Sequence, residues 1–207
     1  MRSSGPGTGG FKGAEMVASI AGVERAGERA EADGFAYSCE ELVGRLLATL
    51  SAAVPEGGRI LELGTGVGVG LAWIVHGLGR RSDVAVHSVE MDERTAALAA
   101  GEDWPQWVTL HVGDAEELLP RLGRFDLLFA DAPGGKWSGL DLTIAALRPG
   151  GVLLVDDMDP ERYGEPEHVA TVAGIRRALT EHPELVTVEL ATGSGIVIAT
   201  RRQAVSA

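Results

Sequence analysis

The stretch that decides the fold runs Ile60-Leu61-Glu62-Leu63-Gly64-Thr65-Gly66-Val67-Gly68. A short, mostly apolar run leads directly into glycines at every second position. Alternate glycines let the backbone turn tightly and approach a ligand where a Cβ atom would clash. In an open α/β sheet, ligands bind at the carboxyl ends of the strands. The stretch therefore predicts a strand, a ligand-binding turn and the start of a helix.

The spacing of these glycines separates the turn from two nucleotide-binding motifs. A dinucleotide fingerprint reads Gly-x-Gly-x-x-Gly, but the sixth position is Val69 when counted from Gly64 and Leu71 when counted from Gly66. No Gly-Lys-Ser/Thr follows, as the phosphate loop of a nucleoside triphosphatase requires. The spacing therefore disfavours both ligand classes.

Short apolar runs alternate with helical patterns after this stretch. We expect strands at Arg59–Leu63, Val84–Val89, Val108–Val112, Phe125–Ala130 and Val152–Val155, and helices near Val69–Gly79, Glu93–Ala100, Ala115–Arg121 and Leu140–Leu147. This alternation predicts an α/β fold whose parallel sheet is covered on both faces. A helix near Glu167–Glu181 then precedes strands at Leu185–Leu190 and Ile196–Thr200, which a tight turn makes antiparallel neighbours.

Two helical patterns come before the glycine stretch, near Glu15–Asp33 and Ser38–Ala53. Ser38 and Glu41 have the spacing of a capping box at the start of the second helix. The segment Met1–Gly13 is rich in glycine and serine and lacks the apolar core of a signal peptide, so we expect a flexible tail. We divide the chain into this tail (1–13) and a single domain (14–207), made of covering helices (14–55) and an α/β core (56–202).

The composition favours some classes of binding partner over others. The 207 residues carry a formal net charge of −12, whereas nucleic-acid-binding proteins usually present a basic face, so a small-molecule substrate is favoured over a nucleic acid. No apolar run is long enough to span a bilayer. The single cysteine, Cys39, cannot form an internal disulfide and is expected to be a half-buried helix residue, which suits a cytoplasmic protein.

Acidic residues accompany the ends of the first three expected strands. Glu62, two positions before the first glycine, suits an ammonium-bearing ligand. Glu90 can accept hydrogen bonds from a ribose diol, with Met91 on an adenine face, and Asp114 can accept from the adenine amino group. An ordinary tight turn explains one glycine loop, but it does not explain acids at three successive strand ends.

Together, Glu62-x-Gly64-x-Gly66-x-Gly68, Glu90 and Gly113-Asp114-Ala115 resemble class I S-adenosylmethionine-dependent methyltransferases. The resemblance covers about Ser38 to Arg201. It implies a Rossmann-like, doubly wound sheet of seven mostly parallel strands in the order 3-2-1-4-5-7-6, with the last strand antiparallel. It also implies S-adenosylmethionine as cofactor, a homodimer, and these cofactor-binding residues: Ser38, Glu62, Gly64, Thr65, Gly66, Gly68, Glu90, Met91, Asp114, Ala115 and Asp131.

Carboxylates also end the fourth and fifth expected strands, as Asp131 and as Asp156-Asp157. Closely spaced carboxylates repel one another, and a hard divalent cation such as Mg²⁺ relieves that repulsion. This arrangement resembles the metal-dependent catechol and caffeoyl-CoA O-methyltransferases. The resemblance implies that Asp131, Asp156 and Asp157 hold the metal, although Asp157 stands where the family has asparagine.

This resemblance also implies a mechanism. A metal chelated by two vicinal hydroxyls of a catechol-like molecule lowers the pKa of one hydroxyl, and Lys136 takes its proton while Asp131 holds the metal. Trp137 would wall an aromatic substrate. Lys136 lies five positions after Asp131, in a longer loop than the family pattern.

Three alternatives remain open. The same fold and cofactor can serve a metal-independent N- or O-methyltransferase of small molecules. A second alternative is a non-catalytic protein that binds S-adenosylmethionine or a dinucleotide. Transfer RNA is a third conceivable partner, which the acidic charge disfavours. In a purely structural interpretation, Asp156-Asp157 caps the next helix, Lys136 lies on the surface and Trp137 covers the edge of the sheet.

Overall fold

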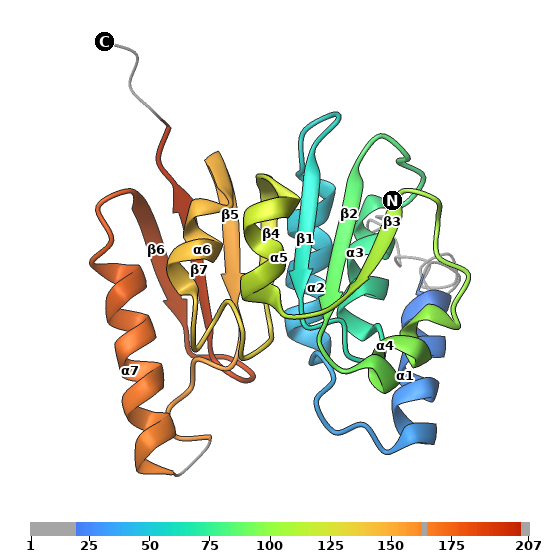
Figure 1. The fold of residues 1–207 in the computed structure, drawn as a ribbon, viewed down its shortest axis with the longest axis horizontal. Helices are drawn as coiled ribbons and strands as arrows, with labels where there is room; N and C mark the ends of the chain where they lie inside the picture. The colour runs from blue at the N-terminus through green and yellow to red at the C-terminus, as the bar shows by residue number, and fades with distance from the viewer. Residues whose placement is uncertain (1–19, 163–164, 204–207) are drawn as a thin grey trace, which may run out of the picture.

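The computed structural model describes residues 20–162 and 165–203. Its centre is one sheet with the strand order β3-β2-β1-β4-β5-β7-β6 (Figure 1). Neighbouring strands are parallel, except that β7 runs antiparallel to both β5 and β6. This confirms the predicted fold and strand order. The strands are β1 (Arg59–Leu63), β2 (Ala85–Glu90), β3 (Val108–Val112), β4 (Phe125–Ala130), β5 (Leu147–Val155), β6 (Leu185–Leu190) and β7 (Ile196–Arg201).

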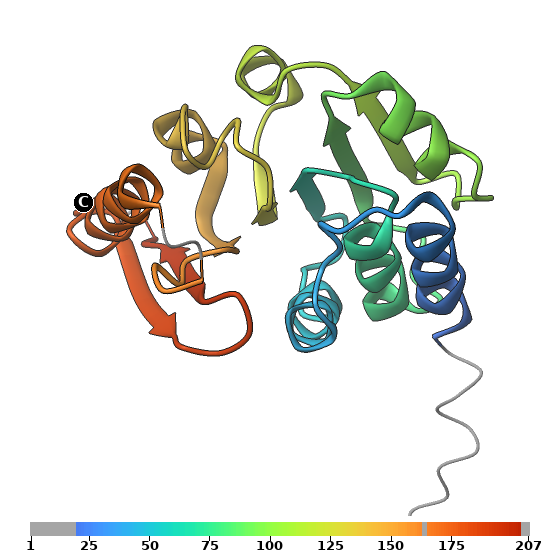
Figure 2. The same ribbon diagram turned by 90° about the horizontal axis from the view of Figure 1, so that it is seen from below.

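Helices cover both faces of the sheet, as Figures 1 and 2 show. One face carries α1 (Ala21–Asp33), α2 (Glu41–Ala52) and α3 (Val69–Leu78), and the opposite face carries α5 (Ala115–Leu122), α6 (Leu140–Ala145) and α7 (Pro166–Thr180). The short helix α4 (Glu93–Ala100) follows β2. No helix in the described part of the chain is both long and apolar enough to cross a membrane.

The central strands are buried on both sides, as parallel strands between two helical layers must be. Successive residues of β1 belong to different apolar clusters. Leu61 and Leu63 pack in the cluster that includes residues of α5 and α6, whereas Ile60 packs with residues of α2 and α3. The sheet is therefore a rigid support whose strand ends hold loops in fixed places.

The start of α2 differs from the prediction. The helix begins at Glu41, its N-cap is Glu40, and no side chain caps it. Ser38 instead lies in a segment without regular secondary structure, residues 35–40, that connects α1 to α2, and Cys39 lies in the same segment, not in a helix. The predicted capping box is wrong because the chain must first cross the edge of the sheet before α2 can pack on α3.

The start of β5 also differs. The prediction placed Leu147 at the end of a helix and began the strand at Val152. In the structure α6 ends at Ala145, and Leu147 already pairs with Phe125 of β4 before a shift in register. Pro149 and Gly150 lie inside this irregular stretch, so the sequence pattern there indicates a turn where the structure has a distorted strand. The domain boundaries remain predictions, and the expected tail 1–13 lies outside the described residues.

Candidate cofactor and acceptor site

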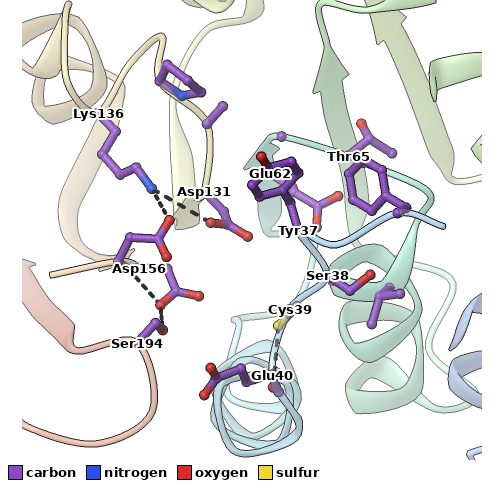
Figure 3. A pocket seen from close by; sticks show the side chains of 18 of the residues that line it. Tyr37, Ser38, Cys39, Glu40, Glu62, Thr65, Asp131, Lys136, Asp156 and Ser194 are labelled. Carbon is purple, nitrogen blue, oxygen red and sulfur yellow. Dashed lines mark hydrogen bonds and ion pairs between the residues drawn. The ribbon is translucent and has the colours of Figure 1, made fainter. Parts of the chain in front are cut away.

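A cavity of ≈ 420 Å³ lies at the carboxyl edge of the sheet. Its walls come from the 35–40 segment, the glycine turn after β1, the ends of β2, β4 and β5, the first turns of α7 and the β6–β7 turn. This volume falls in the usual range of small-molecule sites. Figure 3 shows Ser38, Glu62 and Thr65 on one side of the cavity and Asp131, Lys136 and Asp156 on the other. We call these the turn side and the loop side.

The glycine turn is built for close approach. Gly64 and Gly66 both have positive φ angles, of 97° and 53°, where side chains other than hydrogen are strained. A Cβ atom on Gly64 would lie 2.5 Å from the carbonyl oxygen of Asp131. The backbone amides of Gly64 and Thr65 both donate to the Val89 carbonyl, which fixes the turn on β2. The predicted turn therefore forms part of the cavity wall with its backbone exposed to a ligand.

Glu62 is completely buried at the base of the turn side. Ser88 Oγ donates to Glu62 Oε2 at 2.5 Å, and Thr65 Oγ1 lies 2.6 Å from Ser88 Oγ. Burial raises the pKa of the Glu62 carboxyl well above its ordinary value, and the neighbouring carboxylates of Asp131 and Glu90 raise it further. The other oxygen, Oε1, is buried and has no hydrogen-bond partner among the described residues. A buried acceptor without a partner is costly in a folded protein and indicates a missing donor.

Ser38 and Glu90 complete the turn side. Ser38 Oγ is also buried without a hydrogen-bond partner in the described ranges. Glu90 is held by two backbone amides: Gly66 N donates to Oε2 at 2.8 Å and Asp92 N donates to Oε1 at 3.0 Å. A carboxylate accepts up to about four hydrogen bonds, so Glu90 keeps acceptor capacity toward the cavity.

Four residues predicted for the cofactor do not line the cavity: Gly68, Met91, Asp114 and Ala115. Met91 is exposed, and Asp114 caps α5 by accepting from the amide of Glu116 at 2.8 Å. Gly68 is the N-cap of α3. Their roles toward a cofactor stay predictions, whereas Ser38, Glu62, Gly64, Thr65, Gly66, Glu90 and Asp131 do line the cavity.

On the loop side, Lys136 is 1% exposed although it lies in a loop. Its backbone amide and that of Trp137 both donate to the Pro133 carbonyl, and Thr143 Oγ1 donates to the Gly135 carbonyl at 2.7 Å. These bonds fold the loop inward. The surface interpretation of Lys136 is therefore wrong, and its longer spacing from Asp131 is absorbed by a compact turn.

The Lys136 ammonium lies among the predicted metal ligands. Nζ donates to Asp157 Oδ2 at 2.8 Å and lies 3.7 Å from Asp131 Oδ1. It also lies 4.5 Å from the centre of the Trp137 ring. Burial raises the pKa of Asp131, and Asp156 and Asp157 raise it further, while Lys136 lowers it.

Asp156 is engaged elsewhere. Its Oδ1 accepts from Ser194 Oγ and from the amide of Asp157. Burial raises the pKa of this carboxyl as well. Within the described ranges, no three His, Cys, Asp or Glu side chains come together so as to hold a metal ion. These residues, as placed, do not fit Mg²⁺, because an ammonium lies where the carboxylates would share a cation, so we derive no step through a metal.

The cavity wall also includes residues without a predicted role there, among them Cys39, Arg162, His168 and Ser194. His168 packs edge-on against Trp137, with ring centres 5.1 Å apart, and Arg162 Nη1 pairs with Glu40 at 2.5 Å. Ser194 belongs to a turn whose glycines indicated only a hairpin. These contacts join segments far apart in the sequence, and no local pattern indicates them.

Comparison with known proteins identifies the family. The family model described as "Methyltransferase domain" matches residues 61–158. A relative from Mycobacteroides abscessus named "Putative O-methyltransferase" is 32% identical over 170 residues, which cover 77% of this chain and 79% of that protein. The chain belongs to the class I S-adenosylmethionine-dependent methyltransferases. It is therefore an enzyme of that family, similar in sequence to members named O-methyltransferase.

Solved structures agree with this methyltransferase fold. An O-methyltransferase structure from Klebsiella pneumoniae, also described as "putative", is 27% identical, covers 88% of this chain and 90% of its own, and superposes with a TM-score of 0.75. An O-methyltransferase from Streptomyces achromogenes, solved in complex with SAM, is 22% identical with the same coverage and a TM-score of 0.74. At that identity the second likeness shows the fold alone.

Proposed function

We propose that this methyltransferase transfers a methyl group from S-adenosylmethionine to a hydroxyl oxygen of a small molecule. The observation that carries the proposal is the pair of buried, unpartnered polar atoms on the turn side, Glu62 Oε1 and Ser38 Oγ, which find no partner within the described ranges. S-adenosylmethionine has one ammonium and one carboxylate on its amino-acid end. The ammonium supplies the donor that Glu62 lacks, and the carboxylate accepts from the Ser38 hydroxyl.

The rest of the turn side suits the nucleoside. Glu90 is fixed by two backbone amides and accepts from the ribose diol without further rearrangement. The Gly64–Gly66 backbone leaves room for the amino-acid chain of the cofactor. The relative's O-methyltransferase name and the SAM complex of the Streptomyces structure support this assignment.

The acceptor lies at the loop side. Trp137 and His168 form an aromatic wall, and Lys136, Asp131 and Asp157 provide the polar end. A small hydroxylated aromatic molecule suits this combination. The net charge of −12 opposes a nucleic acid as acceptor. The homodimer and the catechol acceptor stay predictions.

The chemical step is an in-line displacement. The acceptor hydroxyl releases its proton to water, its oxygen attacks the methyl carbon, and the carbon–sulfur bond breaks with its electron pair on sulfur. The products are a methyl ether, a neutral thioether and the released proton. The enzyme contributes alignment of oxygen, carbon and sulfur and exclusion of water. Glu62, Ser38 and Glu90 fix the cofactor, while the Lys136 loop fixes the acceptor.

Calorimetric titration with S-adenosylmethionine tests the proposal. We expect Glu62→Gln and Ser38→Ala each to weaken binding, by about 10-fold or more for Glu62→Gln, because a hydrogen bond to a charged group contributes about 1.5–3 kcal/mol. Glu117→Gln is the matched control, since Glu117 is exposed on α5 and does not line the cavity. The absence of S-adenosylmethionine binding to the wild-type protein would overturn the proposal. Mass spectrometry of products from hydroxylated and aminated aromatic acceptors then distinguishes O- from N-methylation.

A further inference from the structure

The loop side holds a cluster of three acidic side chains with the Lys136 side chain among them, and such a cluster requires a balance of charge. Asp131, Asp156 and Asp157 come from two neighbouring strand ends, and Lys136 comes from the loop after β4. All of them line the cavity. Burying carboxylates without compensating positive charge is costly, so a cation has to lie among them.

The chain supplies that cation itself. Lys136 Nζ lies 2.8 Å from Asp157 Oδ2 and 3.7 Å from Asp131 Oδ1, and its side chain is 2% exposed. A divalent ion in contact with the same oxygens would lie close to the ammonium and be repelled by it.

The residue type at position 157 provides a second observation. Asp157 has a φ of 62°, in the left-handed region that aspartate and asparagine tolerate better than other non-glycine residues. An asparagine would fit this backbone equally well but would bring no charge. The Asp157 carboxylate contacts Lys136 Nζ at 2.8 Å, closer than the Asp131 carboxylate does. The additional negative charge at position 157 is therefore balanced by the ammonium.

Asp156 does not share the Lys136 ammonium with Asp131 and Asp157 through its Oδ1 oxygen. Its Oδ1 accepts from Ser194 Oγ and from the Asp157 amide, which joins it to the β6–β7 turn instead of to Asp131. Figure 3 shows this division, with Lys136 directed toward Asp131 and Asp156 directed toward Ser194. Asp131 and Asp157 thus share the Lys136 ammonium, whereas Oδ1 of Asp156 is held by Ser194.

We propose that the Lys136 ammonium is a built-in replacement for the divalent metal, so that methyl transfer proceeds without a metal and the acceptor needs one acidic hydroxyl, such as that of a phenol, instead of a vicinal pair. This inference rests on the proposed methyltransferase function. The acceptor releases its hydroxyl proton to water and binds as the oxyanion beside Nζ. Its oxygen then takes the methyl group, and the electron pair of the carbon–sulfur bond stays on sulfur, so no further reactant is needed.

Binding of Mn²⁺ alone, followed by electron paramagnetic resonance after EDTA treatment, tests the replacement directly. We expect no site in the wild-type protein below millimolar Mn²⁺. Lys136→Met removes the ammonium and leaves the carboxylates, so we expect it to bind Mn²⁺ about 10–100-fold more tightly than the wild type. Arg94→Met, a change at a mostly exposed side chain that does not line the cavity, is the matched control and should bind no Mn²⁺. Lys136→Arg retains a cation and should also bind none.

Turnover provides the second measurement. We expect the wild-type protein to turn over a simple phenol in the presence of EDTA. We expect added Mg²⁺ to raise the turnover of a catechol by less than about 3-fold. That is well under the 10-fold change that corresponds to 1.4 kcal/mol. A micromolar Mn²⁺ site in the wild type, together with turnover that EDTA abolishes and Mg²⁺ restores, overturns the proposal. A folded Lys136→Met that gains no Mn²⁺ affinity also overturns it. If Lys136→Met does not fold, the wild-type Mn²⁺ titration decides alone.

Failure of the proposed function can be told apart from failure of the metal replacement. The former appears as absent S-adenosylmethionine binding in the calorimeter, whatever the Mn²⁺ result. Failure of the metal replacement appears as Mn²⁺ binding in a protein that still binds S-adenosylmethionine.

Discussion

At the scale of single residues, the two sides of the cavity bury carboxylates in different ways. Glu62 is surrounded by the hydroxyls of Ser88 and Thr65 and has no cation beside it among the described residues, whereas Asp131 and Asp157 share the Lys136 ammonium. A carboxylate buried without a cation favours its protonated form, and a ligand ammonium reverses that preference. Glu62 is therefore poised to respond to a cationic ligand, while the loop side is already neutralised in part.

This difference predicts a pH dependence of stability. The pKa of Glu62 is raised in the folded protein, so the folded state holds the proton more tightly than the unfolded state. Its contribution to the free energy of unfolding is therefore present at low pH and is lost as pH rises from the ordinary value of 4.5 through the raised value. A tenfold difference in proton affinity between the folded and unfolded states corresponds to about 1.4 kcal/mol of that free energy.

Glu62→Gln tests this dependence, since glutamine has nearly the same shape and does not titrate. We expect urea denaturation between pH 4 and pH 8 to show a smaller loss of stability in Glu62→Gln than in the wild type. Asp131 and Asp156 also have raised pKa values and produce a loss of the same sign in both proteins, so the difference isolates Glu62. Equal slopes in the two proteins would contradict the assignment.

The sequence indicated which residues belong to the site better than it indicated which of them contact one another. Glu62, Glu90, Asp131 and Lys136 were predicted from strand ends and family resemblance, and all line the cavity. The ion pair between Lys136 and Asp157 could not be predicted, because it depends on how the 131–139 loop folds inward. Ser38 was assigned both to a cap and to the cofactor, and only its place in the cavity wall distinguishes the two.

At the scale of elements, helices α2 and α3 pack unusually closely. Gly44 of α2 faces the indole of Trp73, and Gly77 of α3 faces the backbone of Ala48, so a Cβ at either glycine would overlap its neighbour. This contact brings α2 close to α3 behind the sheet and thereby sets where the preceding 35–40 segment crosses the cavity. The glycines are needed for close approach, not for backbone freedom.

Gly77→Ala should therefore destabilise the protein by about 1–3 kcal/mol, the usual cost of overpacking, because the backbone of Ala48 cannot rotate away. Gly174→Ala in α7 is the matched control: nothing lies within 4 Å of its Cβ position among the described residues. It should stabilise by about 0.4–1 kcal/mol, since alanine has less freedom in the unfolded chain. Thermal and urea unfolding of both variants measure the contrast, and similar effects in the two would rule out the packing explanation.

Element boundaries followed from the sequence wherever pattern and pairing coincide. The strands Arg59–Leu63, Val108–Val112, Phe125–Ala130 and Leu185–Leu190 have the predicted bounds. The first, second and last of these pair along their whole length, and the third pairs at both of its ends. The start of β5 differs from the prediction, because Leu147 pairs with Phe125 across a distortion at Pro149-Gly150 that resembles a turn in the sequence. Local patterns give element types, but the partner strand sets where a strand begins.

At the scale of the whole molecule, the cavity joins both halves of the sheet. The turn side belongs to β1, β2 and the 35–40 segment, and the loop side belongs to β4, β5, α7 and the β6–β7 turn. The strand order that brings them together came from the family resemblance, not from the pattern of apolar residues alone. Helix and strand patterns indicate an α/β sheet, but they do not fix which strands are neighbours.

Because both halves belong to one continuous sheet and share the cavity wall, binding of the cofactor on the turn side should stabilise the molecule as a single unit. S-adenosylmethionine at 100 times its Kd adds about 2.7 kcal/mol to the free energy of unfolding. For a chain of this size each kcal/mol raises Tm by about 2–4 °C, so we expect one transition that moves upward by roughly 5–11 °C. Adenosine is the matched ligand control: it lacks the ammonium and carboxylate for Glu62 and Ser38 and should shift Tm less at equal concentration. Two transitions, of which S-adenosylmethionine moves only one, would mean that the halves unfold separately and would contradict this prediction.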